Sequence, residues 1–91
     1  MTYQILYSES YTKKAGKFLK KHPQLAKQYQ KTLELLESNP FHPSLRLHSL
    51  TGKLTGVHSV SINLSYRIVL ELIIMDKKII PIDVGNHAQA Y

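Results

Sequence analysis

The sequence predicts an α+β fold of two layers, in which a helical hairpin packs on a mostly antiparallel sheet in the order β-α-α-β-β-β. Two observations lead to this prediction. The first half of the chain carries two stretches with apolar residues at helical spacing, and the second half changes to the alternating pattern of strands. A third observation concerns organisation: no internal repeat or flexible linker divides the sequence, so we expect a single domain over residues 1–91.

The first half is predicted to form a strand followed by two helices. The segment TYQILY is short and rich in β-branched and aromatic residues, as strands are. Ser8 or Ser10 then offers an N-cap for a helix. The apolar stripe of this helix consists of Tyr11, Ala15, Phe18 and Leu19. His22-Pro23 interrupts it, because proline fits a first helical turn but not a helix interior. The stripe of the second helix consists of Leu25, Tyr29, Leu33 and Leu36, and Asn39-Pro40 ends it.

After Pro40 the pattern becomes that of strands. Leu45, Leu47 and the turn-rich segment SLTGKLTG predict a short strand and a hairpin. The following segment alternates apolar and polar residues, which is the period of a strand with one buried face. Its apolar residues are Val60, Ile62 and Leu64, and its polar residues are Ser59, Ser61 and Asn63.

Two further strands complete the predicted sheet. Residues 66–74 are more uniformly apolar and are expected to form a central strand. A turn at 75–77 leads into the last strand, over 78–84. Pro81 in that strand lacks an N–H group, which indicates either a sheet edge or a β-bulge.

Composition limits the classes of function. Twelve Lys and Arg residues against six Asp and Glu residues give a formal charge of +6, which favours a polyanionic or acidic partner. The chain has no cysteine, so disulfides and thiolate chemistry are excluded. The sequence shows neither a secretory signal pattern nor an apolar run of membrane-spanning length, so we expect a cytoplasmic protein without a membrane partner.

Seven lysines lie between residues 10 and 33 with no acidic residue among them. They are Lys13, Lys14, Lys17, Lys20, Lys21, Lys27 and Lys31. The pattern is typical of a solvated helix face, and it also suits a surface that attracts RNA phosphates or an acidic protein. The sequence leaves these alternatives open.

The polar face of the predicted sheet is where we expect chemistry. Ser59, Ser61 and Asn63 lie on it, and Ser65 and Arg67 share one parity in the next segment. Arg67 is one of two arginines in a chain that otherwise uses lysine. It either snorkels or pairs with Glu71, or it recognises phosphate, for which a rigid and permanently charged guanidinium is suited.

Five histidines are candidates for proton transfer. His22 and His42 each precede a proline, where capping or solvent exposure is expected. His48 precedes the glycine turn and His87 begins the C-terminal tail, whereas His58 is expected on the opposite sheet face by its parity. The sequence has no metal-ligand spacing, nucleophilic serine motif or glycine-rich phosphate loop. We therefore expect no metal or other cofactor, with histidine as proton carrier and Arg or Lys as charge stabiliser.

This layout, with the segments LHSLTGKLTGVHSVSINLSYRIVLEL and GNHAQAY, resembles the RelE/ParE superfamily of bacterial toxins, and most closely its YafQ-like branch. The resemblance implies a RelE-like fold and the toxin of a type II toxin–antitoxin system. It implies a ribosome-dependent mRNA endonuclease, so the ribosome and mRNA are expected partners. It also implies a cognate antitoxin that holds the toxin inactive, which we expect to be small, acidic and partly disordered.

The resemblance implies roles for individual residues. His48 and His87 match catalytic histidines, and Arg67 matches the arginine of the strand motif. Tyr91 matches a terminal aromatic residue that helps to place the substrate base. The chain departs from the YafQ-like branch at Ser61 and Ser65, where that branch has a histidine and an aspartate.

Residues and resemblance together predict metal-independent cleavage, in which the 2′-hydroxyl beside the scissile phosphate attacks. His48 is the candidate base and His87 the candidate acid, with the reverse order also open, and Arg67 stabilises the phosphoryl oxygens. The expected substrate contacts are Arg46, Lys53, Ser61, Ser65 and Tyr91. Two alternatives remain: a ParE-like toxin that inhibits DNA gyrase by binding, and a catalytically weak protein retained for antitoxin binding and autoregulation.

Overall fold

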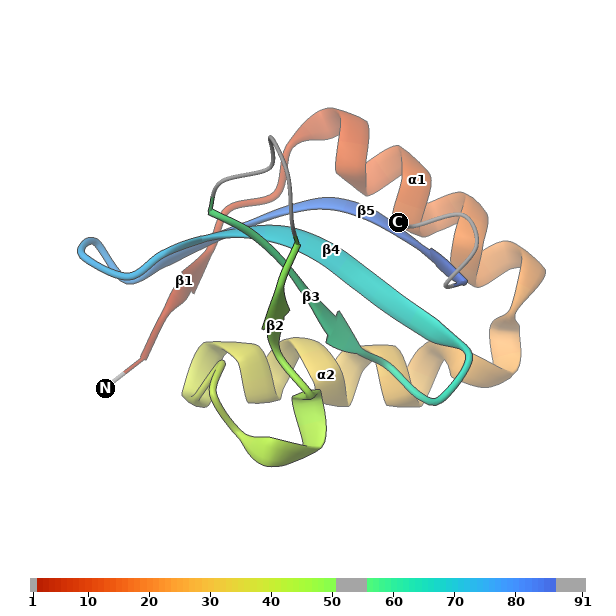
Figure 1. Ribbon diagram of the computed structural model, residues 1–91. Coiled ribbons are helices and arrows are strands. Elements are labelled where there is room, and N and C mark those ends of the chain that lie inside the picture. The colour runs from red at the N-terminus through yellow and green to blue at the C-terminus, as the bar shows by residue number, and fades with distance from the viewer. Residues whose placement is uncertain (1, 51–55, 87–91) are drawn as a thin grey trace.

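Two helices pack on one face of a five-stranded sheet with strand order β1-β5-β4-β3-β2 (Figure 1). The computed structural model describes residues 2–50 and 56–86. The strands are β1 (Gln4–Ile5), β2 (His48–Ser49), β3 (Val57–Ser61), β4 (Tyr66–Ile73) and β5 (Lys78–Asn86). The β1–β5 pair is parallel and the other pairs are antiparallel, which confirms the predicted α+β fold with a mostly antiparallel sheet.

Both predicted helices are present. α1 spans Glu9–Lys21, and Ser8 is its N-cap, because the Ser8 Oγ accepts a hydrogen bond from the Tyr11 N–H at 3.0 Å. Pro23 opens a 3₁₀ turn, Pro23–Leu25, that leads into α2 over Ala26–Ser38. Within the described residues no helix combines the length and apolar character needed to cross a membrane.

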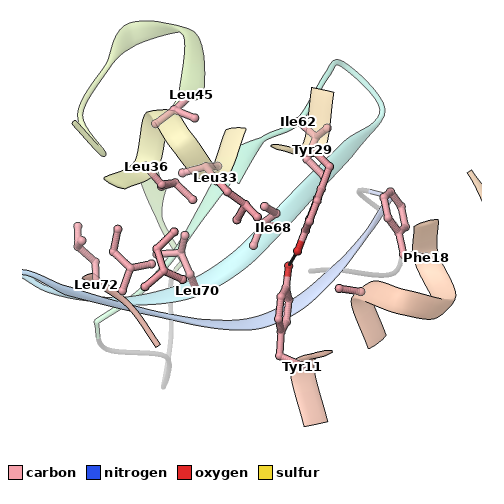
Figure 2. Packing of buried hydrophobic residues seen from close by; sticks show 14 residues of the cluster. Tyr11, Phe18, Tyr29, Leu33, Leu36, Leu45, Ile62, Ile68, Leu70 and Leu72 are labelled. Carbon is pink, nitrogen blue, oxygen red and sulfur yellow. Dashed lines mark hydrogen bonds between the residues drawn. The ribbon is translucent and has the colours of Figure 1, made fainter. Parts of the chain in front are cut away.

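The core lies between the helices and the inner face of the sheet (Figure 2). The helices contribute Tyr11, Ala15, Phe18, Tyr29, Leu33 and Leu36. Alternate residues of the strands meet them, among others Val60, Ile68, Leu70, Leu72 and Ile79. Alternation of this kind leaves the other residues of β3 and β4 on the opposite face of the sheet.

Tyr11 and Tyr29 join the two helices through their hydroxyl oxygens, which lie 2.7 Å apart (Figure 2). Burial raises the pKa of the Tyr11 phenol, and the nearby Tyr29 raises it further. Burial also raises the pKa of Tyr29. Both phenols therefore keep their protons at neutral pH, and one hydroxyl donates to the other. Losing one partner would leave a buried hydroxyl unsatisfied at a cost of about 1–3 kcal/mol, so the pair helps to fix how the helices pack.

The predicted short strand and hairpin are present as β2 paired with β3, but the strand does not include Leu45 or Leu47. Leu45 is buried, but it ends a 3₁₀ turn over Pro43–Leu45, and the short strand β2 begins only at His48. Pro43 occupies the first position of the turn, where its missing N–H is not needed. The ring of His42 caps this turn, because its Nδ1 accepts from the Ser44 N–H at 3.2 Å, which confirms the capping role expected there.

The alternation of the β3 sequence continues past the end of the strand. β3 ends at Ser61, and Asn63 closes a turn by accepting hydrogen bonds from the N–H groups of Ser65 and Tyr66 at 2.8 and 2.9 Å. Leu64 is therefore 79% exposed instead of buried. Ser65 belongs to the same turn and does not share a strand with Arg67, because β4 begins at Tyr66.

Pro81 marks a bulge in β5. The pairing of β4 with β5 shifts register between Val69 and Leu70: Val69 pairs with Asp83 and Leu70 with Pro81, so Ile82 is the extra residue. The alternative of a sheet edge also holds at Pro81 itself, where β5 pairs with β4 alone, although β5 lies between β1 and β4 in the strand order. β1 pairs only with Lys78 and Ile79.

Candidate functional site

The sheet face that points away from the helices, called the outer face below, carries the predicted site. One row across it joins His48, Ser59, Val69 and Asp83, each paired with the next on the neighbouring strand. A second row joins Ser61, Arg67 and Gly85. Residues paired across antiparallel strands share a face, so the register brings His48, Ser59, Ser61 and Arg67 onto one surface, as predicted for the serines and the arginine.

His48 is held by two hydrogen bonds. Its Nδ1 lies 3.3 Å from the backbone oxygen of Arg46, and its Nε2 lies 3.1 Å from the Oγ of Ser59. The Ser59 Oγ also lies 3.4 Å from Nδ1. Because a carbonyl oxygen only accepts, the Arg46 contact is a hydrogen bond when Nδ1 carries the proton, and Nε2 can then accept from the Ser59 hydroxyl. These contacts orient the imidazole on the exposed two-residue strand.

Ser59 supplies this hydroxyl from a buried position. Its side chain is 1% exposed, and the Cα pairing of His48 with Ser59 brings the two side chains together. Sequence reasoning placed Ser59 on the polar face but did not assign it a role. The signal that could have found it is the cross-strand register, which a single sequence does not give.

Arg67 is 6% exposed, although it lies on the face that the helices leave uncovered. Glu71, its expected alternative partner, lies four residues further along β4, or about 13 Å at the usual rise of a strand. The strand spacing puts the Cα atoms of Arg67 and His48 roughly 12 Å apart, so their long side chains can reach a phosphate group between them.

Arg46 and Ser61 meet at the edge of the outer face. Both line a cleft of about 470 Å³, together with Gln28, Ser44 and Asn63. Arg46 has a left-handed backbone with φ of 50°, which costs a residue other than glycine of order 1–3 kcal/mol. The same conformation belongs to the turn that presents the Arg46 carbonyl to His48. Ser65 is exposed in the β3–β4 turn.

Three of the predicted site residues lie outside the described residues. They are Lys53, His87 and Tyr91. His87 follows Asn86, the last residue of β5, directly in the sequence, and Gly85 in that strand pairs with Arg67.

The remaining histidines lie away from the outer face. His58 pairs with Leu70 and so lies on the helix side of the sheet, as its parity predicted. His22 is the C-cap of α1, as expected, since its N–H donates to the Phe18 carbonyl at 3.0 Å. Its ring contacts the rings of Phe18 and Tyr66, with centroids 4.9 and 4.8 Å away. Among residues 2–50 and 56–86 the structure brings together no group of three His, Asp or Glu residues that would hold a metal ion.

Asp83 is an acidic residue in the His48 row that sequence reasoning missed. The bulge at Ile82 shifts the parity of β5, so the simple alternation from Lys78 assigns Asp83 to the wrong face. Its Oδ1 accepts a hydrogen bond from the Val84 N–H at 2.8 Å.

Solved structures share the fold of this chain. A chain of the E. coli DinJ–YafQ toxin–antitoxin complex matches with a TM-score of 0.79 and 22% identity, covering 100% of this chain and 99% of that one. YafQ from E. coli strain BL21(DE3) matches with a TM-score of 0.76 and 20% identity, covering 94% of each chain. The chain has the RelE-like toxin fold.

A third RelE-like structure belongs to the YoeB–YefM toxin–antitoxin complex from Staphylococcus aureus, with a TM-score of 0.71 and 20% identity over 96% of this chain and 99% of that one. No protein-family model and no curated protein sequence matches the chain. The likeness is therefore one of fold, and within the RelE-like fold the outer face described above is the candidate site.

Proposed function

We propose that this chain is the toxin of a type II toxin–antitoxin system and cleaves mRNA on the ribosome. The observation that carries the proposal is the outer face itself, where the strand register places the imidazole of His48 and the buried Arg67 on one surface. The RelE-like fold, shared with YafQ and with a YoeB–YefM complex, supports the assignment.

The proposed reaction uses the RNA as its own nucleophile. The 2′-oxygen forms a bond to phosphorus while the bond from phosphorus to the 5′-oxygen breaks. A base takes the proton of the 2′-hydroxyl, and an acid gives a proton to the departing 5′-oxygen. The products are a 2′,3′-cyclic phosphate and a 5′-hydroxyl.

His48 suits the role of the base. Its Nε2 carries the lone pair when Nδ1 donates to the Arg46 carbonyl. In the described structure the Ser59 Oγ lies against the ring, 3.1 Å from Nε2 and 3.4 Å from Nδ1. The substrate 2′-hydroxyl would donate to Nε2 while Ser59 stays against the ring and holds its orientation. His87 is the proposed acid. The reverse, with His87 as the base and His48 as the acid, is the alternative.

The other proposed groups contact the phosphates and a nucleobase of the RNA. Arg67 would stabilise the phosphoryl oxygens as negative charge builds on them, because a fixed guanidinium needs no reorganisation in the transition state. Arg46, Lys53, Ser61 and Ser65 would contact the RNA backbone. Tyr91 would stack on a base, an interaction worth about 1–3 kcal/mol.

The proposed partner is an acidic antitoxin. The formal charge of +6 favours such a partner. Two of the structures with a similar fold were solved as complexes with DinJ and with YefM. A small, partly disordered chain that orders on binding would cover the outer face and block the site.

The function is tested by adding purified protein to a translating extract. We expect cleavage of the translated mRNA, with 5′-hydroxyl ends, and no cleavage of the same mRNA when translation is blocked. Plasmid supercoiling is measured in parallel. Intact mRNA with altered supercoiling would instead identify a gyrase-binding toxin, and no effect in either assay would identify a protein retained for antitoxin binding.

Replacement of Ser59 by alanine tests its role as a positioning residue. We expect cleavage to slow by about tenfold, since His48 loses the hydrogen bond that orients its ring, which is worth about 0.5–1.5 kcal/mol. Ser59→Thr keeps the hydroxyl and should retain the rate. The ¹⁵N shifts of the His48 ring, which report the tautomer, should change in Ser59→Ala and not in Ser59→Thr. Equal rates and shifts in both variants would contradict the assignment.

A further inference from the structure

A second cleft lies between α1 and the side of β5 that faces away from β4. Its volume is about 600 Å³, and its walls are α1 on one side and residues 83–86 of β5 on the other. Lys14, Lys17, Lys20 and Lys21 line it, and the spacing of Lys14, Lys17 and Lys21 places these three on one stripe of the helix. The cleft shares β5 with the outer face but opens at the edge of the sheet.

Three aromatic rings line the same cleft. Phe18 and His22 come from the α1 side, and Tyr66 comes from β4. Their ring centroids lie 4.8 to 5.3 Å apart, so the rings are in mutual contact. His22 and Tyr66 are only half-buried. The cleft thus combines a row of cations with partly exposed ring surface, the pairing that nucleic-acid-binding grooves use.

The backbone edge of β5 in this cleft is already occupied. The Lys14 Nζ donates to the Ile82 carbonyl at 3.4 Å, and the Val84 N–H donates to Asp83 Oδ1 at 2.8 Å. A peptide strand added here would find both groups taken, and side chains that cap an edge in this way oppose strand addition. What remains available to a ligand is the charge of the lysines.

We propose that this cleft binds the phosphate backbone of RNA. The proposal rests on the proposed function for its choice of RNA over other polyanions. The RNA belongs either to the mRNA that flanks the cut or to the ribosome, and the two sources offer the same phosphate chemistry. The lysines attract the phosphate backbone of the RNA. Asp83 is the acidic residue in the cleft wall, and its Oδ1 accepts a hydrogen bond from the Val84 N–H.

The test uses two variants with the same loss of charge. One carries Lys14→Gln, Lys17→Gln and Lys21→Gln in the cleft. The other carries Lys13→Gln, Lys27→Gln and Lys31→Gln, which do not line it. Binding to a fluorescent single-stranded RNA with 2′-O-methyl groups, which is not cleavable, is measured over a range of salt concentrations. Binding to purified ribosomes is measured alongside, and urea unfolding checks that both variants are folded.

We expect the cleft variant to lower the slope of log K against log salt by about 2, since each phosphate contact on a single strand contributes about 0.7. The control should change the slope by less than half of that. If the cleft variant binds the oligonucleotide more weakly, the cleft binds mRNA. If it binds only ribosomes more weakly, the cleft binds ribosomal RNA. Equal losses in the two variants would overturn the proposal, and so would unchanged RNA binding with lost binding of a polyglutamate peptide.

Failure of the cleft and failure of the proposed function give different results. The binding assay needs no cleavage, so wild-type protein that binds RNA through the cleft but cuts no mRNA in a translating extract refutes only the nuclease. If the protein cuts mRNA but the cleft substitutions do not change its RNA binding, only the proposal for the cleft is refuted.

Discussion

Replacing His48 or His87 by alanine is expected to slow mRNA cleavage by about 10²–10⁴-fold, the usual contribution of a general acid or base. Cleavage is measured in a translating extract at matched concentrations of soluble protein. His48 is exposed on a two-residue strand, so its loss should leave the midpoint of urea unfolding nearly unchanged. The reduction would then report on chemistry and not on folding.

His58 is the matched control for these substitutions. It is also an imidazole on the sheet, but it lies on the helix side, paired with Leu70. We expect His58→Ala to keep nearly all cleavage activity. If growth arrest by the His48, His87 and His58 variants equals that of the wild type, the nuclease assignment is wrong and the protein acts by binding.

Leu70→Ala is expected to cause a large loss of stability. Leu70 is 0% exposed at the centre of β4, and truncating a buried leucine to alanine costs about 2–5 kcal/mol. A domain of this size has a free energy of unfolding of about 5–15 kcal/mol, so the urea midpoint should fall by a large fraction. The midpoint is followed by circular dichroism.

Leu64→Ala removes the same atoms from an exposed turn. Leu64 is 79% exposed, so the free energy of unfolding should change by no more than about 0.5 kcal/mol. A comparable loss in both variants would mean that Leu64 is buried in solution, as the sequence alternation predicted, and that the end of β3 at Ser61 is misplaced.

The helices and the central strands were predictable because their signals are local. The stripe from Tyr11 to Phe18 needs only the helical period, and Ser8 marks where it begins. The wrong predictions fall where residues that form turns interrupt a segment whose apolar and polar residues alternate as in a strand. Asn63 ends β3 although the alternation runs on to Leu64, and Pro43 turns Leu45 into a 3₁₀ residue although its neighbours resemble a strand.

The sequence allowed us to predict which residues share the outer face, but not which of them contact one another. The alternation of β3 predicted that Ser59 and Ser61 lie on one face with Arg67, and the strand register confirms this placement. The bond between Ser59 and His48 depends on how β2 aligns with β3, and the place of Asp83 depends on a bulge. Both are long-range features that no local pattern encodes. The roles of His48, Arg67, His87 and Tyr91 stay predictions.

The pairing of the first strand with the last one sets the order in which this protein is completed during its synthesis. β1 finds its partner only when Lys78 and Ile79 have left the ribosome, and α1 likewise packs against β5. Until then the apolar stripe of α1 lacks the strand it packs against. The nascent chain therefore completes its core only after β5 has been made, and a chain released before that point should be cleared by proteases instead of folding.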